Sequence, residues 1–143
     1  MKYSEIERKM KTTAIIEIGK DLTYDIYTVD DKLGFMLMGQ GSSITEAKAD
    51  LLRSKEDMKQ IFKKDGRVFD FDSLEFDYKY DTASFLRYSP FTLTWLSYAT
   101  GINKKQLSHY TSGIRRPSRH TLQKIQEAVV GFAKDYQQVC LVD

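Results

Sequence analysis

The stretch LTWLSYATGINKKQLSHYTSGIRRPS, residues 93–118, decides the fold of the C-terminal part of the chain. Two helical patterns flank a tight turn, in which Gly101 can adopt a positive φ and Asn103 can cap the next helix. The first helix is predicted to open at Thr92 or Thr94, and the second to span residues 104–111 and end at Gly113. This is the spacing of two helices joined by a short turn, as in a helix-turn-helix.

Apolar side chains of this stretch are expected to lock the two helices together: Leu96, Ala99, Ile102, Leu107 and Tyr110. The side chains that remain outward on the second helix are polar or basic: Lys104, Lys105, Gln106, Ser108, His109 and Thr111. They can donate or accept hydrogen bonds at base edges and phosphates, and none is a carboxylate. The alternative interpretation is an ordinary solvated helix face.

Charge is distributed unevenly along the chain. Residues 82–126 contain no Asp or Glu, but they contain seven Lys and Arg residues and both histidines. Residues 81–143 carry eight basic and four acidic side chains, whereas residues 1–80 carry 14 basic and 16 acidic ones. A basic surface without carboxylates favours a polyanionic partner, so the two regions are expected to have different roles.

Helical periodicity continues on both sides of the central stretch. Asp81 is expected to cap a preceding helix that Pro90 closes, and Ser118 to cap a final one. The final helix carries an apolar stripe of Leu122, Ile125, Val129, Phe132 and Tyr136. Residues 81–143 are therefore predicted to form an all-α domain of four short helices.

Residues 10–80 have a different periodicity. Alternating or β-branched runs predict strands at 12–18, 23–29 and 35–40, joined by short links as an antiparallel meander, with Gly39 marking a bulge. Ser43 and Glu46 form a capping box ahead of a long helix that Gly66 ends. Residues 74–80 then alternate again, with their inward side chains being Leu74, Phe76, Tyr78 and Tyr80. The expected fold class is α+β, a β-β-β-α-β sandwich followed by the all-α domain, and residues 1–9 are expected to form a loosely ordered extension.

Several classes of protein are disfavoured by composition. A single cysteine, Cys140, excludes an intramolecular disulfide and argues against a cysteine-based zinc site, and His109 and His120 are too far apart in sequence to suggest a metal site. No apolar run approaches the roughly 20 residues of a membrane span, and the charged start lacks the core of a signal peptide. We expect a cytoplasmic protein that requires no cofactor or metal and does not contact a membrane.

Residues 101–118 resemble the recognition helix of the Xre/Cro-like phage-repressor family. The shared pattern is a glycine, an aliphatic residue, a cap, a polar triplet, an aliphatic residue, a polar pair, an apolar residue, a second glycine and a basic stretch ending in Pro-Ser. Ser97 stands where that family usually has alanine. The resemblance implies that Lys105, Gln106 and His109 face the major groove, with Lys104 or Ser108 at its edge. It also implies that the phosphate backbone is contacted by Arg115, Arg116 and Arg119.

The whole chain resembles the HicB antitoxin family, on the segment 39–43 that leads into Thr45-Glu46-Ala47. It departs from that family at residues 30–34, where the usual proline is missing. The resemblance implies a degenerate RNase-H-like N-terminal domain that binds a small HicA-like RNase toxin. It also implies a C-terminal domain that represses its own operon on double-stranded operator DNA, as a homodimer or a higher even-numbered oligomer.

Two other functions remain open. One is a stand-alone repressor-like regulator whose N-terminal domain binds a protein or a ligand. The other is a metal-dependent, RNase-H-like nuclease, because a two-metal site needs clustered carboxylates. The candidates for such a site are Asp70, Asp72, Glu75 and Asp77, although the first two are expected in a linker and the others on a solvent face.

Overall fold

The computed structural model describes residues 9–29 and 31–143. Backbone contacts divide the chain into two compact units, Met1–Asp81 and Thr82–Asp143. The chain is a mixed α/β protein, consistent with the expected α+β class. The predicted extension at residues 1–9 falls, except for Lys9, outside the described residues, as does Asp30 of the predicted turn.

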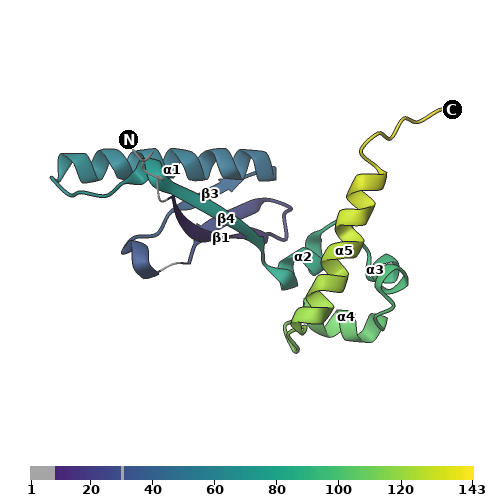
Figure 1. Cartoon of the computed structure of the whole chain (residues 1–143). Helices are drawn as coiled ribbons and strands as arrows, with labels where there is room; N and C mark the ends of the chain where they lie inside the picture. Colours follow the sequence, from purple (N-terminus) through teal and green to yellow (C-terminus); the bar gives the residue numbers. More distant parts are fainter. Residues whose placement is uncertain (1–8, 30) are drawn as a thin grey trace, which may run out of the picture. The chain divides into compact units, whose positions relative to one another are not determined.

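The first unit is built on a four-stranded sheet (Figure 1). Its strands are β1 (Met10–Ile18), β2 (Tyr24–Thr28), β3 (Met38–Gly41) and β4 (Leu74–Tyr80). They lie in the order β3-β2-β1-β4, where β1 and β2 pair antiparallel, β2 and β3 pair antiparallel, and β4 joins β1 in parallel. A parallel pair needs a long crossover, which the helix between β3 and β4 supplies.

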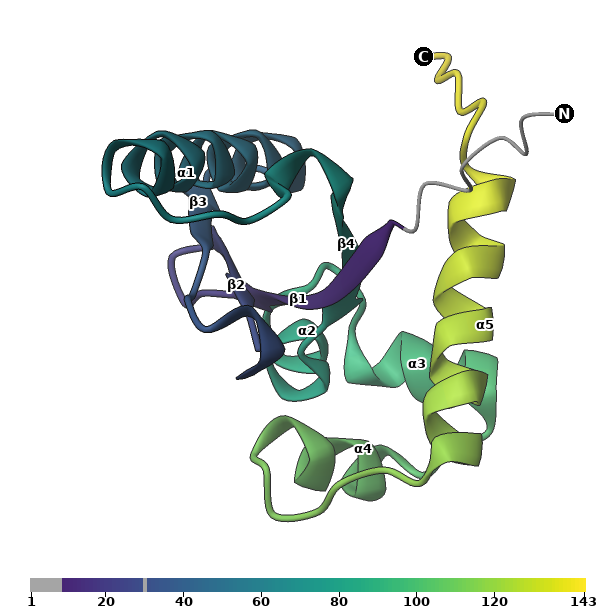
Figure 2. The same cartoon turned by 60° about the vertical axis from the view of Figure 1, so that its left-hand side comes forward.

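Helix α1 (Ile44–Lys64) covers one face of this sheet (Figures 1 and 2). The side chains of β1 alternate in burial, as expected when only one face of a strand meets the core. The core of this unit, to which α1 and the sheet both contribute, consists of Ala14, Ile16, Ile26, Leu33, Leu37, Ala47, Leu51 and Leu74. Tyr80, which the periodicity predicts on the inner face, is about half exposed, because it lies at the end of β4.

Gly39 lets α1 contact the backbone of β3 directly. It pairs with Ile26 in regular register, so the predicted bulge is wrong. A Cβ at this position would lie 2.5 Å from the carbonyl oxygen of Ala47 and 2.5 Å from the amide nitrogen of Leu51. A Cβ at Gly41 would collide with the same helix, 2.5 Å from the nitrogen of Ala47. The glycines of β3 are therefore required by close packing and not by a change in strand geometry.

Both ends of α1 are satisfied by local hydrogen bonds. The Ser43 hydroxyl accepts from the Glu46 amide at 3.1 Å, and the Glu46 carboxylate accepts from the Ser42 amide at 2.9 Å. The hydroxyl and amide of Ser42 thereby lower the pKa of Glu46. At the other end Gly66 has a φ of 70°, and the Arg67 amide donates to the Phe62 carbonyl at 2.8 Å. This is a Schellman motif, and it ends the helix where the glycine predicted.

Residues 65–73 are more ordered than the linker that the sequence suggested. They contain the 3₁₀ turn η2 (Phe71–Ser73), and another such turn, η1 (Asp31–Leu33), precedes β3. Four aromatic rings cluster here with centroids 4.7–6.3 Å apart: Phe35, Phe62, Phe69 and Phe71. The Phe35 ring packs in this cluster and not in the sheet, so the strand predicted at 35–40 begins only at Met38.

The described regular structure of the second unit is helical. The helices are α2 (Thr82–Tyr88), α3 (Leu93–Thr100), α4 (Lys104–Thr111) and α5 (Arg119–Asp135). Side-chain caps are provided by Thr92, Asn103 and Ser118. The core consists of Leu86, Leu96, Ile102, Leu107, Tyr110 and Ile125. Ala99 was expected in that core but is exposed, because α3 turns this side away from α4.

A second aromatic cluster joins α5 to the segment around α3. The Phe132 ring lies 5.1 Å from Phe91, 5.3 Å from Trp95 and 4.3 Å from Tyr136. Tyr98 is 90% exposed and takes no part in this packing. Among the described residues, no helix combines the length and the apolar character needed to cross a bilayer.

Candidate nucleic-acid interface

The turn between α3 and α4 is fixed by several hydrogen bonds. Gly101 has a φ of 74°, and its amide donates to the Ser97 carbonyl at 2.9 Å. The Ser97 hydroxyl donates to the Ile102 carbonyl at 2.6 Å, and the Ile102 amide donates to the Thr100 hydroxyl at 3.2 Å. The Asn103 side chain accepts from the Lys105 amide at 2.8 Å. The angle at which α4 leaves α3 is therefore determined by polar contacts as well as by buried Ile102.

The burial of α4 defines its outward face. Leu107 is fully buried and Tyr110 is only 4% exposed, so these two side chains attach the helix to the core. The opposite face and the cap are exposed, and His109 is half-buried between the two faces. The exposed predicted site residues on this element are Asn103, Lys104, Lys105, Gln106 and Ser108.

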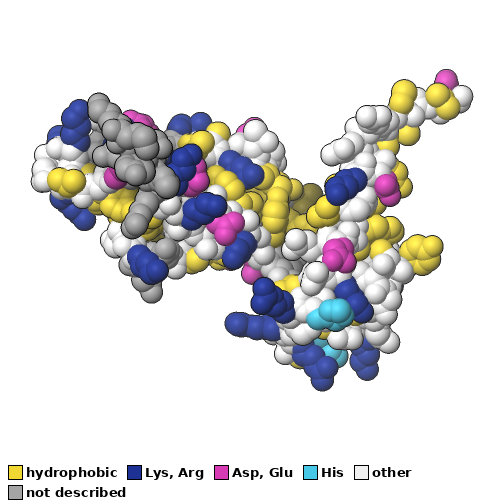
Figure 3. Space-filling model, in the orientation of Figure 1, with side chains coloured by type: hydrophobic (Ala, Val, Ile, Leu, Met, Phe, Trp, Pro, Cys, Tyr) yellow, Lys and Arg dark blue, Asp and Glu magenta, His cyan; other side chains and the backbone are white. Residues whose placement is uncertain are grey.

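The other predicted site residues lie in the segment between α4 and α5 and at the first residue of α5. Gly113 has a φ of 76°, and the Arg115 amide donates to the His109 carbonyl at 3.3 Å, which folds the segment back on the end of α4. Arg115, Arg116 and Arg119 are exposed. Figure 3 shows basic side chains and both histidines gathered over α4 and the start of α5. The predicted site residues thus occupy one helix, its cap and the segment that follows.

These cations form no salt bridge with a carboxylate of the described residues. The salt bridges of the described residues all belong to the first unit: Lys9–Glu75, Arg53–Asp50, Lys59–Asp72 and Lys79–Asp77. None of the helices α2–α5 has an acidic residue in its first turn. The positive potential of this surface is therefore not neutralised internally.

The basic residues also oppose the dipoles of their own helices. Lys104 and Lys105 lie in the first turn of α4, and Arg119 and His120 in the first turn of α5. Helix N-termini carry partial positive charge, so cations there are unfavourable by several tenths of a kcal/mol each. A local cost of this kind, repeated at the starts of two successive helices, is typical of a surface whose charge serves an anionic ligand.

Gln106 has a contact that the sequence analysis missed. Its side-chain Nε2 donates to the Tyr110 hydroxyl at 2.6 Å. The sequence feature that indicates this contact is the four-residue spacing of Gln106 and Tyr110, because residues i and i+4 are neighbours on a helix surface. The sequence pattern itself predicts only that the Tyr110 side chain packs between the two helices.

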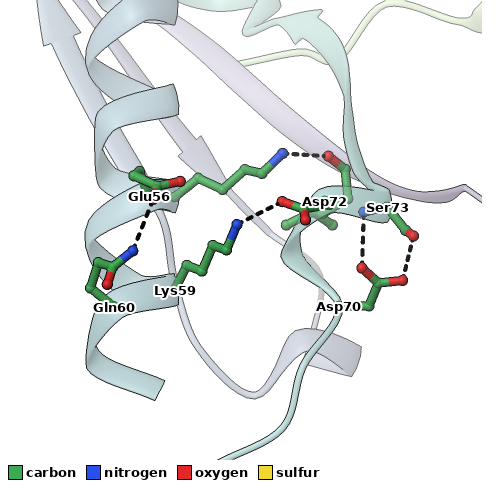
Figure 4. Close-up of polar contacts among 8 residues, drawn as sticks. Glu56, Lys59, Gln60, Asp70, Asp72 and Ser73 are labelled. Carbon is green, nitrogen blue, oxygen red and sulfur yellow. Dashed lines mark hydrogen bonds and ion pairs between the residues drawn. The ribbon is translucent and has the colours of Figure 1, made fainter. Parts of the chain in front are cut away.

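The carboxylates considered for a nuclease have structural partners (Figure 4). Asp70 caps η2 by accepting from the Ser73 amide at 3.3 Å, and Asp72 pairs with Lys59 of α1 at 3.0 Å. Glu75 pairs with Lys9 at 2.8 Å. In residues 9–29 and 31–143, no group of three or more His, Cys, Asp or Glu side chains is arranged to hold a metal ion.

Comparison of the chain with protein-family models, with curated proteins and with solved structures finds no match.

Proposed function

We propose that the second unit is a helix-turn-helix module and that the protein is a sequence-specific DNA-binding repressor. The observation that carries this proposal is the outward face of α4 with the adjoining α4–α5 segment, where exposed cations that form no salt bridge with the described residues follow a hydrogen-bonded turn. A single protruding helix fits the major groove of B-DNA, which is about 12 Å wide.

The residues on this surface have separable roles. Lys105, Gln106 and His109 lie on α4, where a helix in the groove meets base edges, and Lys104 and Ser108 lie beside them. Two arginines of the α4–α5 segment and one at the start of α5 would contact phosphates, which give affinity without sequence information. They are Arg115, Arg116 and Arg119.

The first test selects genomic fragments bound by the full chain and footprints them. We expect a palindrome with half-sites one helical turn, about 10 bp, or a multiple of it apart, because a symmetric dimer presents two recognition helices. Recovery of fragments without a shared sequence, or of an asymmetric single site, would contradict the proposal of a dimeric repressor.

The second test separates base reading from phosphate contact. Lys105→Ala or Gln106→Ala should cost roughly 1–3 kcal/mol of binding free energy on the operator and relax the sequence preference. Arg116→Ala should weaken binding to operator and random DNA equally. Lys134→Ala, in the last turn of α5, is the matched control and should change neither affinity. Equal losses on both DNAs for Gln106→Ala would exclude base reading by this residue.

A second candidate function is that the first unit binds a protein, as the antitoxin of a HicA/HicB-type pair. Its specific support is that α1, the only α-helix described in this unit, covers one face of the sheet. The register places Ile15, Tyr27 and Met38 on the other face, where Met38 is exposed. A sheet face with apolar residues that is not covered by the described helix of its own unit is suited to a partner.

Co-expression tests the antitoxin proposal directly. A small basic protein encoded beside this gene should be toxic alone and harmless together with the full chain, and the two should copurify. Ile15→Lys should abolish copurification without changing DNA binding. If no neighbouring product binds the chain, a stand-alone regulator is the better description.

A further inference from the structure

The hydrogen bond between Gln106 and Tyr110 links the outward face of α4 to the core of the unit. Gln106 is exposed, whereas the Tyr110 ring is buried among Leu86, Leu96, Leu107 and the other core residues. A free Gln106 side chain would be flexible. Here its Nε2 lies 2.6 Å from the Tyr110 hydroxyl, and the ring that carries this hydroxyl is packed in the core. The core therefore sets the direction of one polar side chain on the proposed recognition helix.

The bond leaves the amide with a defined set of free groups. A side-chain amide has two N–H donors and one carbonyl acceptor, and the Tyr110 hydroxyl takes one donor. The N–H on the carbonyl side of the nitrogen and the carbonyl form one edge of the amide, and this edge is free when Tyr110 accepts from the other N–H. Adenine in the major groove presents an N7 acceptor beside an N6 donor, and this edge matches both at once.

We propose that Tyr110 is a positioning residue for base recognition and that it orients Gln106 to read the adenine of an A·T pair. This inference rests on the proposed DNA-binding function. Ordering Gln106 before it meets DNA reduces the entropy lost on binding, so the hydroxyl favours the correct base over its competitors. Tyr110 itself does not touch DNA in this scheme.

The test uses the full chain and removes only the hydroxyl, by Tyr110→Phe. The base pair read by Gln106 is first identified as the one at which Gln106→Ala loses discrimination in a set of single-substitution operators. A bidentate contact gives roughly 5–150-fold discrimination. At that pair, Tyr110→Phe should reduce the discrimination at least threefold, with unchanged discrimination elsewhere and unchanged affinity for random DNA. Tyr98→Phe, which also removes one tyrosine hydroxyl from this unit, is the control and should match the wild type.

A double mutant separates positioning from a general structural role. In the Gln106→Ala background, Tyr110→Phe should have no further effect on DNA binding, because the residue through which it acts is gone. An equal loss of affinity on all sequences in both backgrounds would show that the hydroxyl only supports the fold, and would overturn the inference.

The remaining outcomes distinguish this inference from the function on which it rests. Wild-type binding without any sequence preference would refute the proposed function. Preserved preference together with normal discrimination by Tyr110→Phe would refute only the positioning role. A pair other than A·T at the Gln106 position would refute the assignment of adenine.

Discussion

Tyr27 and Glu17 form a side-chain hydrogen bond on the sheet face opposite α1. The Tyr27 hydroxyl donates to the Glu17 carboxylate at 2.6 Å. This bond is the main reason that the pKa of Tyr27 is raised to about 12, with burial and the charge of Glu17 as further causes. The ionised phenolate would lose the bond and face a carboxylate, so the neutral tyrosine is favoured in the folded state.

We predict a contribution to stability that is lost in alkaline solution. Because the pKa is raised on folding, the stabilisation is complete below pH 10 and disappears as the pH rises towards 12. Tyr27→Phe should lower the free energy of unfolding by about 1 kcal/mol at pH 8, after allowance for solvent screening. The difference from wild type should shrink at pH 11 in urea titrations followed by circular dichroism. A difference that does not change with pH would contradict this assignment.

Ser97 shows why single residues were the hardest part of the site to predict. The sequence indicates only that a serine stands where the resembled family usually has an alanine. In the structure, the Ser97 hydroxyl donates a hydrogen bond across the α3–α4 turn to the Ile102 carbonyl. The bond depends on the positive φ of Gly101, which brings that carbonyl back over α3. The Gln106–Tyr110 bond was missed because it requires the rotamers of two side chains. Side-chain contacts that depend on backbone angles and rotamers cannot be predicted from residue types alone.

At the scale of elements, the contact between β3 and α1 leaves no space for a side chain at Gly39. Gly39→Ala would place a Cβ 2.5 Å from two backbone atoms of α1, which cannot move without displacing the helix. We predict a loss of about 3 kcal/mol or more in the free energy of unfolding, measured by denaturant titration. A loss below 1 kcal/mol would mean that α1 can shift away from the sheet.

Gly131 in α5 provides the opposite case. Nothing lies within 4 Å of the Cβ that Gly131→Ala would add, and no positive φ is required there. Alanine loses less backbone entropy than glycine on entering a helix, so we predict a gain of roughly 0.5–1 kcal/mol. The same titration checks this prediction, and destabilisation would show that the α5 surface at this position is not free.

Helices and strands were predicted accurately where the residues that determine their ends lie close to them in the sequence. The bounds of α4 were predicted to the residue because Gly101, Asn103 and Gly113 specify its two ends within the segment itself. The strand predicted at 35–40 was too long, since Phe35 is recruited by rings some 30 residues away. Gly39 was interpreted as a bulge because its real neighbour, α1, is not adjacent along the strand.

At the scale of the whole molecule, each unit has its own core and so should respond to its own core substitutions. Leu51→Ala lies in the first core and Leu107→Ala in the second, and each should cost about 2–5 kcal/mol. The chain has a single tryptophan, Trp95, which packs beside the second core. Its fluorescence transition in urea should therefore shift strongly for Leu107→Ala and little for Leu51→Ala. An equal shift for both would show that the units unfold as one.

The proposed interface predicts a steep dependence of DNA affinity on salt. Each phosphate contact releases condensed counterions, so the logarithm of the binding constant falls linearly with the logarithm of salt concentration. Arg116→Ala should reduce the slope by about 1, whereas Gln106→Ala should leave the slope unchanged while lowering the affinity. Fluorescence anisotropy at four salt concentrations gives both slopes. An unchanged slope for Arg116→Ala would place this residue away from the phosphates.

The exposed cations of α4 and α5 also affect the stability of the protein when nothing is bound to it. The cations at the starts of α4 and α5 are repelled by the positive ends of the helix dipoles, so the free unit is less stable than it would be with acidic residues at these positions. A polyanion that binds the folded form more tightly than the unfolded chain must raise the stability of the folded form by linkage. Unbound copies would then open and be degraded first, so the lifetime of each molecule would depend on whether it is occupied.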